Sequence, residues 1–217
     1  MTRSSSTWRT LIGIAVIAAL AYSAGYLASS RQQVAVFPPT SAGFIWPPPP
    51  PLEPFTLTDT DDRTFDQTRF SDRWTLVFFG YTHCPDICPT TMQILGEIHQ
   101  RLGGHDLYVQ RGQVLFISVD EQRDTPEQLR RYTDHFSPDF LAATGPAEEL
   151  HRITGQFGVQ IVRVSGSSPD EYWYDHPSSI LLIGPDQKLA GVFVPPLDAE
   201  DIAAQVQAIV DWADRRG

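Results

Sequence analysis

The sequence predicts an α/β domain, a sheet with helices on both of its faces, preceded by a membrane anchor and a proline-rich linker. Two nearly continuous apolar runs, Trp74–Phe79 and Val114–Val119, are typical of strands buried on both faces. Segments with helical periodicity alternate with these strands, which is the pattern of an α/β sheet. The stretch Leu11–Ala28 contains no charged residue, and this predicts the anchor.

The composition of the 217 residues limits the classes of partner. There are 26 Asp and Glu against 16 Lys and Arg, a net charge of −10. Because phosphate binding needs a basic face, we expect no nucleic acid partner. The two cysteines are too few for a disulfide scaffold or an all-cysteine zinc site. Together they can form one disulfide or part of one small metal site.

The N-terminal region predicts where the protein resides. We expect residues 1–10 to be a cytoplasmic N-terminus, 11–28 a transmembrane anchor, 29–51 a proline-rich periplasmic linker and 52–217 the globular domain. Arg3 and Arg9 precede the apolar stretch, so the domain is expected to be exported across a bacterial inner membrane in a single pass. A cleaved signal peptide is the alternative. Five consecutive prolines, Pro47–Pro51, favour an extended, semi-rigid spacer.

The first half of the domain begins with a half-buried strand, because Phe55 and Leu57 alternate with threonines, and Asp59–Arg63 follows as a turn. After the strand Trp74–Phe79, we expect a loop over Gly80–Pro89. This loop leads into a helix with an apolar face, which carries Met92, Leu95, Ile98 and Leu102.

The second half starts with a helix at Thr125, where threonine is the expected N-cap and Pro126 the first helical residue. The remaining elements are read from their apolar patterns. They are a helix over Ala147–Phe157, a strand over Val159–Val164, two strands over Ile180–Ile183 and Gly191–Val194, and a final helix from Asp198 that carries Ile202, Val206, Ile209, Val210 and Trp212.

Both cysteines lie in one segment, Tyr81–Thr90, where a buried strand is expected to end and a helix to begin. A thiol near a helix N-terminus is expected to have a lowered pKa. Cys84 and Cys88 are four residues apart, so on a helix they would share a face. They could then form a disulfide, bind a metal ion together, or be inert buried cysteines.

Two thiolates alone suit Cu(I), so we look for a third ligand among the six histidines. His83 adjoins Cys84, but its side chain is expected to point away from the thiolates. His176 follows the aromatic segment Glu171–Asp175, interpreted as a loop, and precedes a buried strand, where α/β folds place sites. The other four are expected on solvated faces: His99, His105, His135 and His151.

Three segments together resemble the Sco (SenC) family of membrane-tethered, thioredoxin-like copper chaperones for cytochrome c oxidase. They are Phe78–Pro89, which contains Thr-His-Cys-Pro-Asp-Ile-Cys-Pro, Ile117–Pro126, and Asp175–Asp186. The resemblance covers about Pro54 to Val210 and implies a thioredoxin-like fold, a central mixed sheet flanked by helices, for 52–217.

The resemblance implies that Cys84 and Cys88 bind copper, Cu(I) or Cu(II), as thiolates and that His176 supplies an imidazole nitrogen. It places Asp120 and Asp124 near the site in a supporting role. Alternatively, Asp124 helps to begin the helix at Thr125. The chain departs from the family at Pro177, where a small hydroxylated residue is usual, and at Gly184, where an Asp is common.

The resemblance predicts a metallochaperone rather than an enzyme, one that delivers copper to the dinuclear copper site of cytochrome c oxidase. Its expected partners are the oxidase subunit with that site, and another periplasmic copper chaperone or a thioredoxin-like reductant. The alternative is a periplasmic thiol–disulfide oxidoreductase that keeps oxidase-subunit or other exported cysteines reduced. Cys84 would then attack and Cys88 resolve. A peroxidase is a weaker third alternative.

Overall fold

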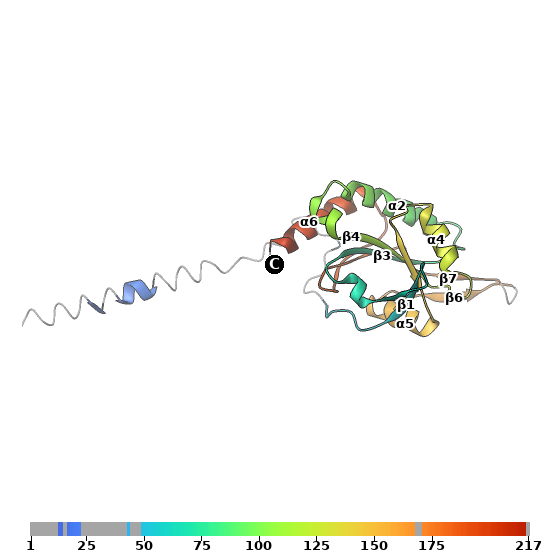
Figure 1. Ribbon diagram of the computed structural model, residues 1–217, viewed down its shortest axis with the longest axis horizontal. Coiled ribbons are helices and arrows are strands. Elements are labelled where there is room, and N and C mark those ends of the chain that lie inside the picture. The colour runs from blue at the N-terminus through green and yellow to red at the C-terminus, as the bar shows by residue number, and fades with distance from the viewer. Residues whose placement is uncertain (1–12, 15–16, 23–42, 44–48, 168–170, 216–217) are drawn as a thin grey trace, which may run out of the picture. The chain divides into compact units, whose positions relative to one another are not determined.

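The computed structural model describes residues 13–14, 17–22, 43, 49–167 and 171–215 (Figure 1). The chain divides into two compact units, Met1–Pro39 and Thr40–Gly217. Most of the predicted anchor, 11–28, and of the predicted linker, 29–51, lies outside the described residues. Residues 13–14 and 17–22 are helical, and no helix within the described ranges is long and apolar enough to cross a membrane.

The second unit is built on a seven-stranded mixed sheet with the strand order β2-β1-β5-β4-β3-β8-β9. The pairs β3–β4 and β4–β5 are parallel and the other pairs antiparallel. A separate hairpin is formed by β6 and β7. The strands are β1 (Thr56–Asp59), β2 (Thr64–Asp66), β3 (Trp74–Gly80), β4 (Gly112–Ser118), β5 (Leu141–Thr144), β6 (Val162–Ser165), β7 (Tyr172–Asp175), β8 (Ile180–Ile183) and β9 (Leu189–Phe193).

Helices cover both faces of this sheet, as predicted. Figure 1 shows α2 and α6 on one side and α5 on the other. In β3, Leu76 and Phe78 belong to the core under α2 and α6, whereas Val77 and Phe79 belong to the core under α5. The helices are α2 (Ile87–Leu102), α3 (Asp106–Arg111), α4 (Pro126–Asp134), α5 (Ala147–Gln156) and α6 (Ala199–Asp214), with a 3₁₀ turn η1 (Gln67–Phe70).

The predicted starts of the helices at Thr125 and at Asp198 are confirmed. The hydroxyl of Thr125 accepts a hydrogen bond from the backbone N–H of Gln128, and the carboxylate of Asp198 accepts one from that of Asp201. Three short elements, β2, α3 and β5, were not predicted because they carry too little periodicity to be recognised.

Two expectations near the cysteines are wrong. The segment Gly80–Pro89 is not all loop, because β3 extends through Gly80 and α2 begins at Ile87. The aromatic segment before His176 is strand β7, paired with β6, rather than a loop. Its alternation explains the strand: Tyr172 and Tyr174 are half-buried, whereas Trp173 and Asp175 are exposed. The strand expected over Val159–Val164 begins later, at Val162.

Candidate metal centre

Cys84 lies in the loop between β3 and α2, not on the helix as its spacing from Cys88 suggested. The backbone N–H of Cys84 donates to the carbonyl of Tyr81 (3.3 Å), and this bond turns the loop back on itself. The backbone N–H of Cys88, in the first turn of α2, donates to Sγ of Cys84 (3.4 Å). The helix has no side-chain cap at Asp86, and a sulfur atom instead accepts one of its free N–H groups.

Cys88 is completely buried, whereas Cys84 is half-buried, and both carry free thiols. Sγ of Cys88 lies against Gly80, where an added Cβ would come within 2.9 Å of the sulfur. Burial raises the pKa of the Cys88 thiol. The expected lowering by the helix N-terminus is therefore wrong for Cys88, because loss of solvent outweighs the helix dipole.

His176 directly follows β7, is 8% exposed, and places Nε2 3.3 Å from Sγ of Cys88. Its Nδ1 lies 3.1 Å from the carbonyl oxygen of Pro177. A carbonyl can only accept, so Nδ1 carries the proton and Nε2 presents a lone pair to the cysteines. Burial also lowers the pKa of His176, which favours the neutral imidazole. The ring packs against Phe78 and Tyr81.

The ligating atoms of Cys84, Cys88 and His176 all lie within 4.8 Å of one another. The three residues come from a loop, the first turn of α2 and the end of the β6–β7 hairpin, so the fold brings together the three predicted ligands. Two sulfurs and one imidazole nitrogen form a soft donor set that fits copper. A closed structural zinc site would need a fourth protein ligand.

Asp124 joins the cysteine loop to the end of β4. Its Oδ2 accepts from the backbone N–H of Thr82 (2.8 Å) and from the hydroxyl of Ser118 (2.6 Å). Its Oδ1 accepts from the hydroxyl of Thr82 (2.6 Å). The alternative that Asp124 begins the helix is not needed, since the hydroxyl of Thr125 caps α4. Within the described ranges, no hydrogen bond joins Asp120 or Asp124 directly to the three candidate ligands.

Asp120 joins β4 to the hairpin that precedes His176. It is completely buried and accepts from the hydroxyl of Tyr172 (2.8 Å) and from Nε of Arg123. The sequence alone did not single out Arg123 or Tyr172. Their only signal was position, because Arg123 lies between the two aspartates and Tyr172 lies four residues before His176.

The remaining histidines lie elsewhere. His83 turns toward Thr82 and Asp124, with Nδ1 3.2 Å from the Thr82 hydroxyl, and not toward the sulfurs. His135 and His151 are exposed, as expected. The expectation of a solvated face is wrong for two of the others. His105 caps α3 and lies 3.0 Å from Asp211, and His99 is half-buried against Tyr108 and Phe140.

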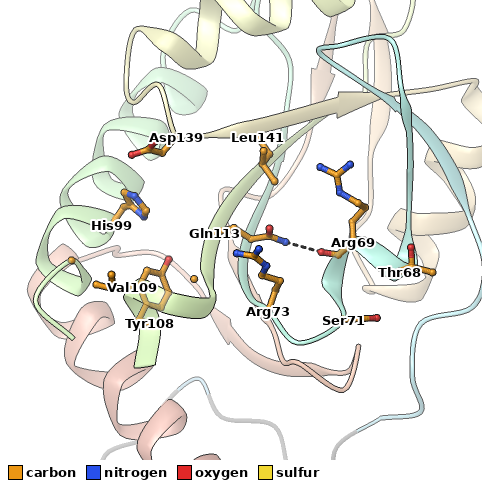
Figure 2. Close-up of a pocket in the computed structure, with 12 residues that line it drawn as sticks. Thr68, Arg69, Ser71, Arg73, His99, Tyr108, Val109, Gln113, Asp139 and Leu141 are labelled. Carbon is orange, nitrogen blue, oxygen red and sulfur yellow. Dashed lines mark hydrogen bonds between the residues drawn. The ribbon is translucent and has the colours of Figure 1, made fainter. Parts of the chain in front are cut away.

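A cavity of about 740 Å³ opens at the other edge of the sheet, where β3 and β4 begin (Figure 2). Arg69, Arg73, His99, Tyr108 and Asp139 are among the residues that line it. None of the predicted site residues does. This cavity therefore shares no residue with the candidate metal centre.

Comparison with known proteins finds one family. The SCO1/SenC family model matches residues 48–211. A Stutzerimonas stutzeri protein named for copper binding is 32% identical over 155 residues, 71% of this chain and 74% of that protein. An SCO2-like protein of Rickettsia conorii is 36% identical over 135 residues; the match covers 62% of this chain but only 64% of that protein.

The solved structures agree with the fold. Bradyrhizobium japonicum ScoI, solved with copper bound, is 30% identical and superposes with a TM-score of 0.65. The match covers 73% of this chain and 98% of that one. The expected thioredoxin-like arrangement, a central mixed sheet flanked by helices, is confirmed.

Proposed function

The chain belongs to the SCO1/SenC family, and we propose that it is a copper chaperone that binds one copper ion through Cys84, Cys88 and His176. Copper would pass from this site to the dinuclear copper site of cytochrome c oxidase. The observation that carries the proposal is the position of Nε2 of His176, 3.3 Å from Sγ of Cys88. A dithiol oxidoreductase has no need of an imidazole across its two sulfurs.

The two cysteines have different parts in uptake. Cys84 is the more exposed and meets incoming copper first. Cys88 has a raised pKa and therefore enters as a thiol, so copper binding releases its proton. His176 then donates from Nε2 without a change of tautomer. Three protein donors leave a coordination position for a thiolate of the receiving subunit, so copper moves by ligand exchange without becoming a free ion.

The location follows from the same proposal. An anchor over 11–28 and an extended linker over 29–51 would hold the domain on the periplasmic side of a bacterial inner membrane. The oxidase subunit that receives copper is itself a membrane protein in this proposal. A tether of this length would keep the metal centre within reach of that subunit.

Thiol–disulfide exchange is the second candidate function, supported by the unequal exposure of the cysteines and by the N–H of Cys88 beside Sγ of Cys84. The Cys84 thiolate would attack a target disulfide and release one target thiolate. Cys88, losing its proton, would then attack the Cys84 sulfur and release the second. Two electrons reach the target, and Cys84 and Cys88 end as a disulfide.

The test is anaerobic copper titration of the reduced full chain in detergent, alongside His176→Ala and His151→Ala. We expect one copper per chain. We also expect His176→Ala to change the sulfur-to-Cu(II) absorption bands and to lower Cu(II) affinity at least about tenfold. His151 is exposed on α5, so His151→Ala should match the parent protein.

Two other outcomes would change the proposal. Weak copper binding by the reduced chain, together with fast exchange of a Cys84–Cys88 disulfide, would favour the oxidoreductase. Tight binding that His176→Ala leaves unchanged would keep a copper protein but remove His176 from its ligands.

A further inference from the structure

The hairpin that carries His176 is not part of the main sheet. Strands β6 and β7 pair only with each other among the described strands. The backbone ladder therefore does not fix where the hairpin lies over the cysteines. Its side-chain contacts must do so: Tyr174 packs against both hydrophobic cores, and Tyr172, the first residue of β7, makes the polar contacts to the segment after β4.

Tyr172 is held from two directions. Its hydroxyl donates to Oδ1 of Asp120 (2.8 Å), and its carbonyl accepts from Nη1 of Arg123 (3.3 Å). The guanidinium carbon of Arg123 lies 3.8 Å from the centre of its ring. Since Nε of Arg123 also donates to Oδ2 of Asp120, the three residues form a closed set of contacts.

The base of this set is Asp120, which is anchored at the end of β4. Asp120 is completely buried, and its backbone N–H donates to the hydroxyl of Ser118 at the end of β4 (3.1 Å). A buried carboxylate needs a partner for its charge, and Arg123 supplies one. Asp120 therefore fixes Arg123, and both fix Tyr172.

The same set reaches the cysteine loop through Tyr81. The Arg123 guanidinium lies 5.9 Å from the centre of the Tyr81 ring. That ring packs edge-on against Tyr174 (5.5 Å) and His176 (5.9 Å). The carbonyl of Tyr81 accepts from the N–H of Cys84. One arginine thus contacts both segments that carry the candidate ligands.

We propose that Asp120, Arg123 and Tyr172 form a latch, a set of positioning residues that docks the β6–β7 hairpin and keeps Nε2 of His176 against Sγ of Cys88. The inference rests on the proposed copper site and adds residues that determine its nitrogen ligand. Cu(I) can be held by two thiolates, whereas Cu(II) gains more from an imidazole. The latch therefore controls Cu(II) affinity more than Cu(I) affinity.

The experiment compares Arg123→Gln with Arg131→Gln in the reduced and copper-loaded full chain. Arg131 forms an exposed pair with Glu127 on α4, so it is a matched control. In Arg123→Gln we expect Cu(II) affinity to fall about 10–100-fold, the range found for lost outer partners of metal ligands. Cu(I) affinity should change less than about threefold, and the nitrogen hyperfine coupling in the Cu(II) EPR spectrum should weaken. Arg131→Gln should leave all three unchanged.

Two milder variants show whether the loss of affinity arises from the latch or from a folding defect. Tyr172→Phe removes only the hydroxyl bond to Asp120 and should lower Cu(II) affinity several-fold in the same selective way. Arg123→Lys keeps the charge but lacks the planar fork that bonds Asp120 and Tyr172 together, so it should not restore the affinity.

A measurement on the copper-free protein tests the latch independently of the proposed copper function. In the copper-free parent protein, imidazole ¹⁵N NMR should show one His176 tautomer with the proton on Nδ1, and in Arg123→Gln a mixture. If the parent protein binds no copper, the proposed function fails while the NMR comparison still tests the latch. If folded Arg123→Gln keeps the single tautomer, the nitrogen coupling and parental Cu(II) affinity, the latch is wrong.

Discussion

Two buried or half-buried histidines lie at opposite edges of the same sheet, His176 where β3 and β4 end and His99 beside the cavity where they begin. Burial lowers the pKa of both imidazoles. Their partners differ. Nδ1 of His176 donates to a carbonyl and Nε2 faces a sulfur, whereas Nδ1 of His99 is buried without a hydrogen-bond partner in the structure.

The difference shows which features mark a site in this molecule. We call the end of the sheet with the candidate metal centre the metal edge and the end with the cavity the cavity edge. At the metal edge, Asp120 and Asp124 are both fully buried and both accept hydrogen bonds, which connect them to the cysteine loop and to the hairpin. At the cavity edge, the Tyr108 hydroxyl is also buried without a partner (Figure 2). Unpartnered polar atoms are not confined to the cavity, since Nη2 of Arg123 is also buried without a partner; the metal edge differs because several side chains and backbone groups there bond to Asp120 and Asp124. Convergence of donors, rather than volume or a perturbed pKa, distinguishes the metal edge.

The largest effect that tests this contrast should come from Asp124→Ala. It removes the acceptor of three hydrogen bonds and leaves the Thr82 N–H and the Ser118 hydroxyl with lost partners. Bonds to a charged acceptor are worth about 1.5–3 kcal/mol each, so we expect a loss of at least about 3 kcal/mol in the free energy of unfolding. Urea denaturation of the copper-free protein measures it.

Asp134→Ala is the control, because Asp134 is exposed at the end of α4 and should change stability by less than about 0.5 kcal/mol. A loss below about 1 kcal/mol for Asp124→Ala would mean that the network at the metal edge contributes no more than ordinary surface contacts. The contrast between the two edges would then be one of geometry only.

A smaller effect is expected from Gly80→Ala, which tests how tightly the metal edge is packed. The new Cβ would lie 2.9 Å from Sγ of Cys88 and 2.9 Å from the Phe116 ring. Overpacking of this kind costs about 1–3 kcal/mol, and the displaced sulfur should also weaken copper binding. Thermal denaturation and copper titration measure the two effects.

Gly155 provides the matched alanine substitution. It lies within α5, and a Cβ there would meet nothing within 4 Å. Gly155→Ala should therefore stabilise the protein by about 0.5–1 kcal/mol through helix propensity. If both alanines stabilised the protein, Sγ of Cys88 would be free to move and would not be held against Gly80.

The same contrast shows how much the sequence could predict. The apolar runs predicted the buried strands β3 and β4, and Thr125 and Pro126 predicted the start of α4. Strand β5, Leu141–Thr144, could not be predicted, because two alanines and a threonine form a strand only when neighbouring strands bury them.

For the candidate site, short motifs predicted Cys84, Cys88 and His176, which the fold brings together. Arg123 and Tyr172 could not be predicted, since their contact joins residues 49 positions apart through the docking of a hairpin. His99 could have been placed correctly, because it lies four residues after the buried Leu95 on one face of α2. The polar residues next to His99 in the sequence instead led to the prediction of a solvated face.

The smallest expected effect comes from His99→Phe, which tests the cavity edge directly. Phenylalanine keeps a ring against Tyr108 and Phe140 but removes the buried nitrogen that has no partner. We expect stabilisation of about 1 kcal/mol at pH 7.5, because an unsatisfied buried polar atom is lost. Urea denaturation of the copper-free protein at pH 7.5 and 5.5 measures this and the pH dependence together.

The pH dependence has a defined sign. Because the folded pKa of His99 is lowered, the unfolded chain binds more protons as the pH falls below about 6.5, the ordinary histidine value. Protonation of His99 in the unfolded chain therefore adds no penalty well above pH 6.5 and destabilises the fold increasingly below it. His176 acts in the same direction in both proteins, so His99→Phe should reduce the loss between pH 7.5 and 5.5 without abolishing it. His151→Gln, at an exposed position, should keep the full loss. An unchanged loss in His99→Phe would mean that His99 can be protonated in the folded protein, and that the cavity edge solvates a charge that the metal edge excludes.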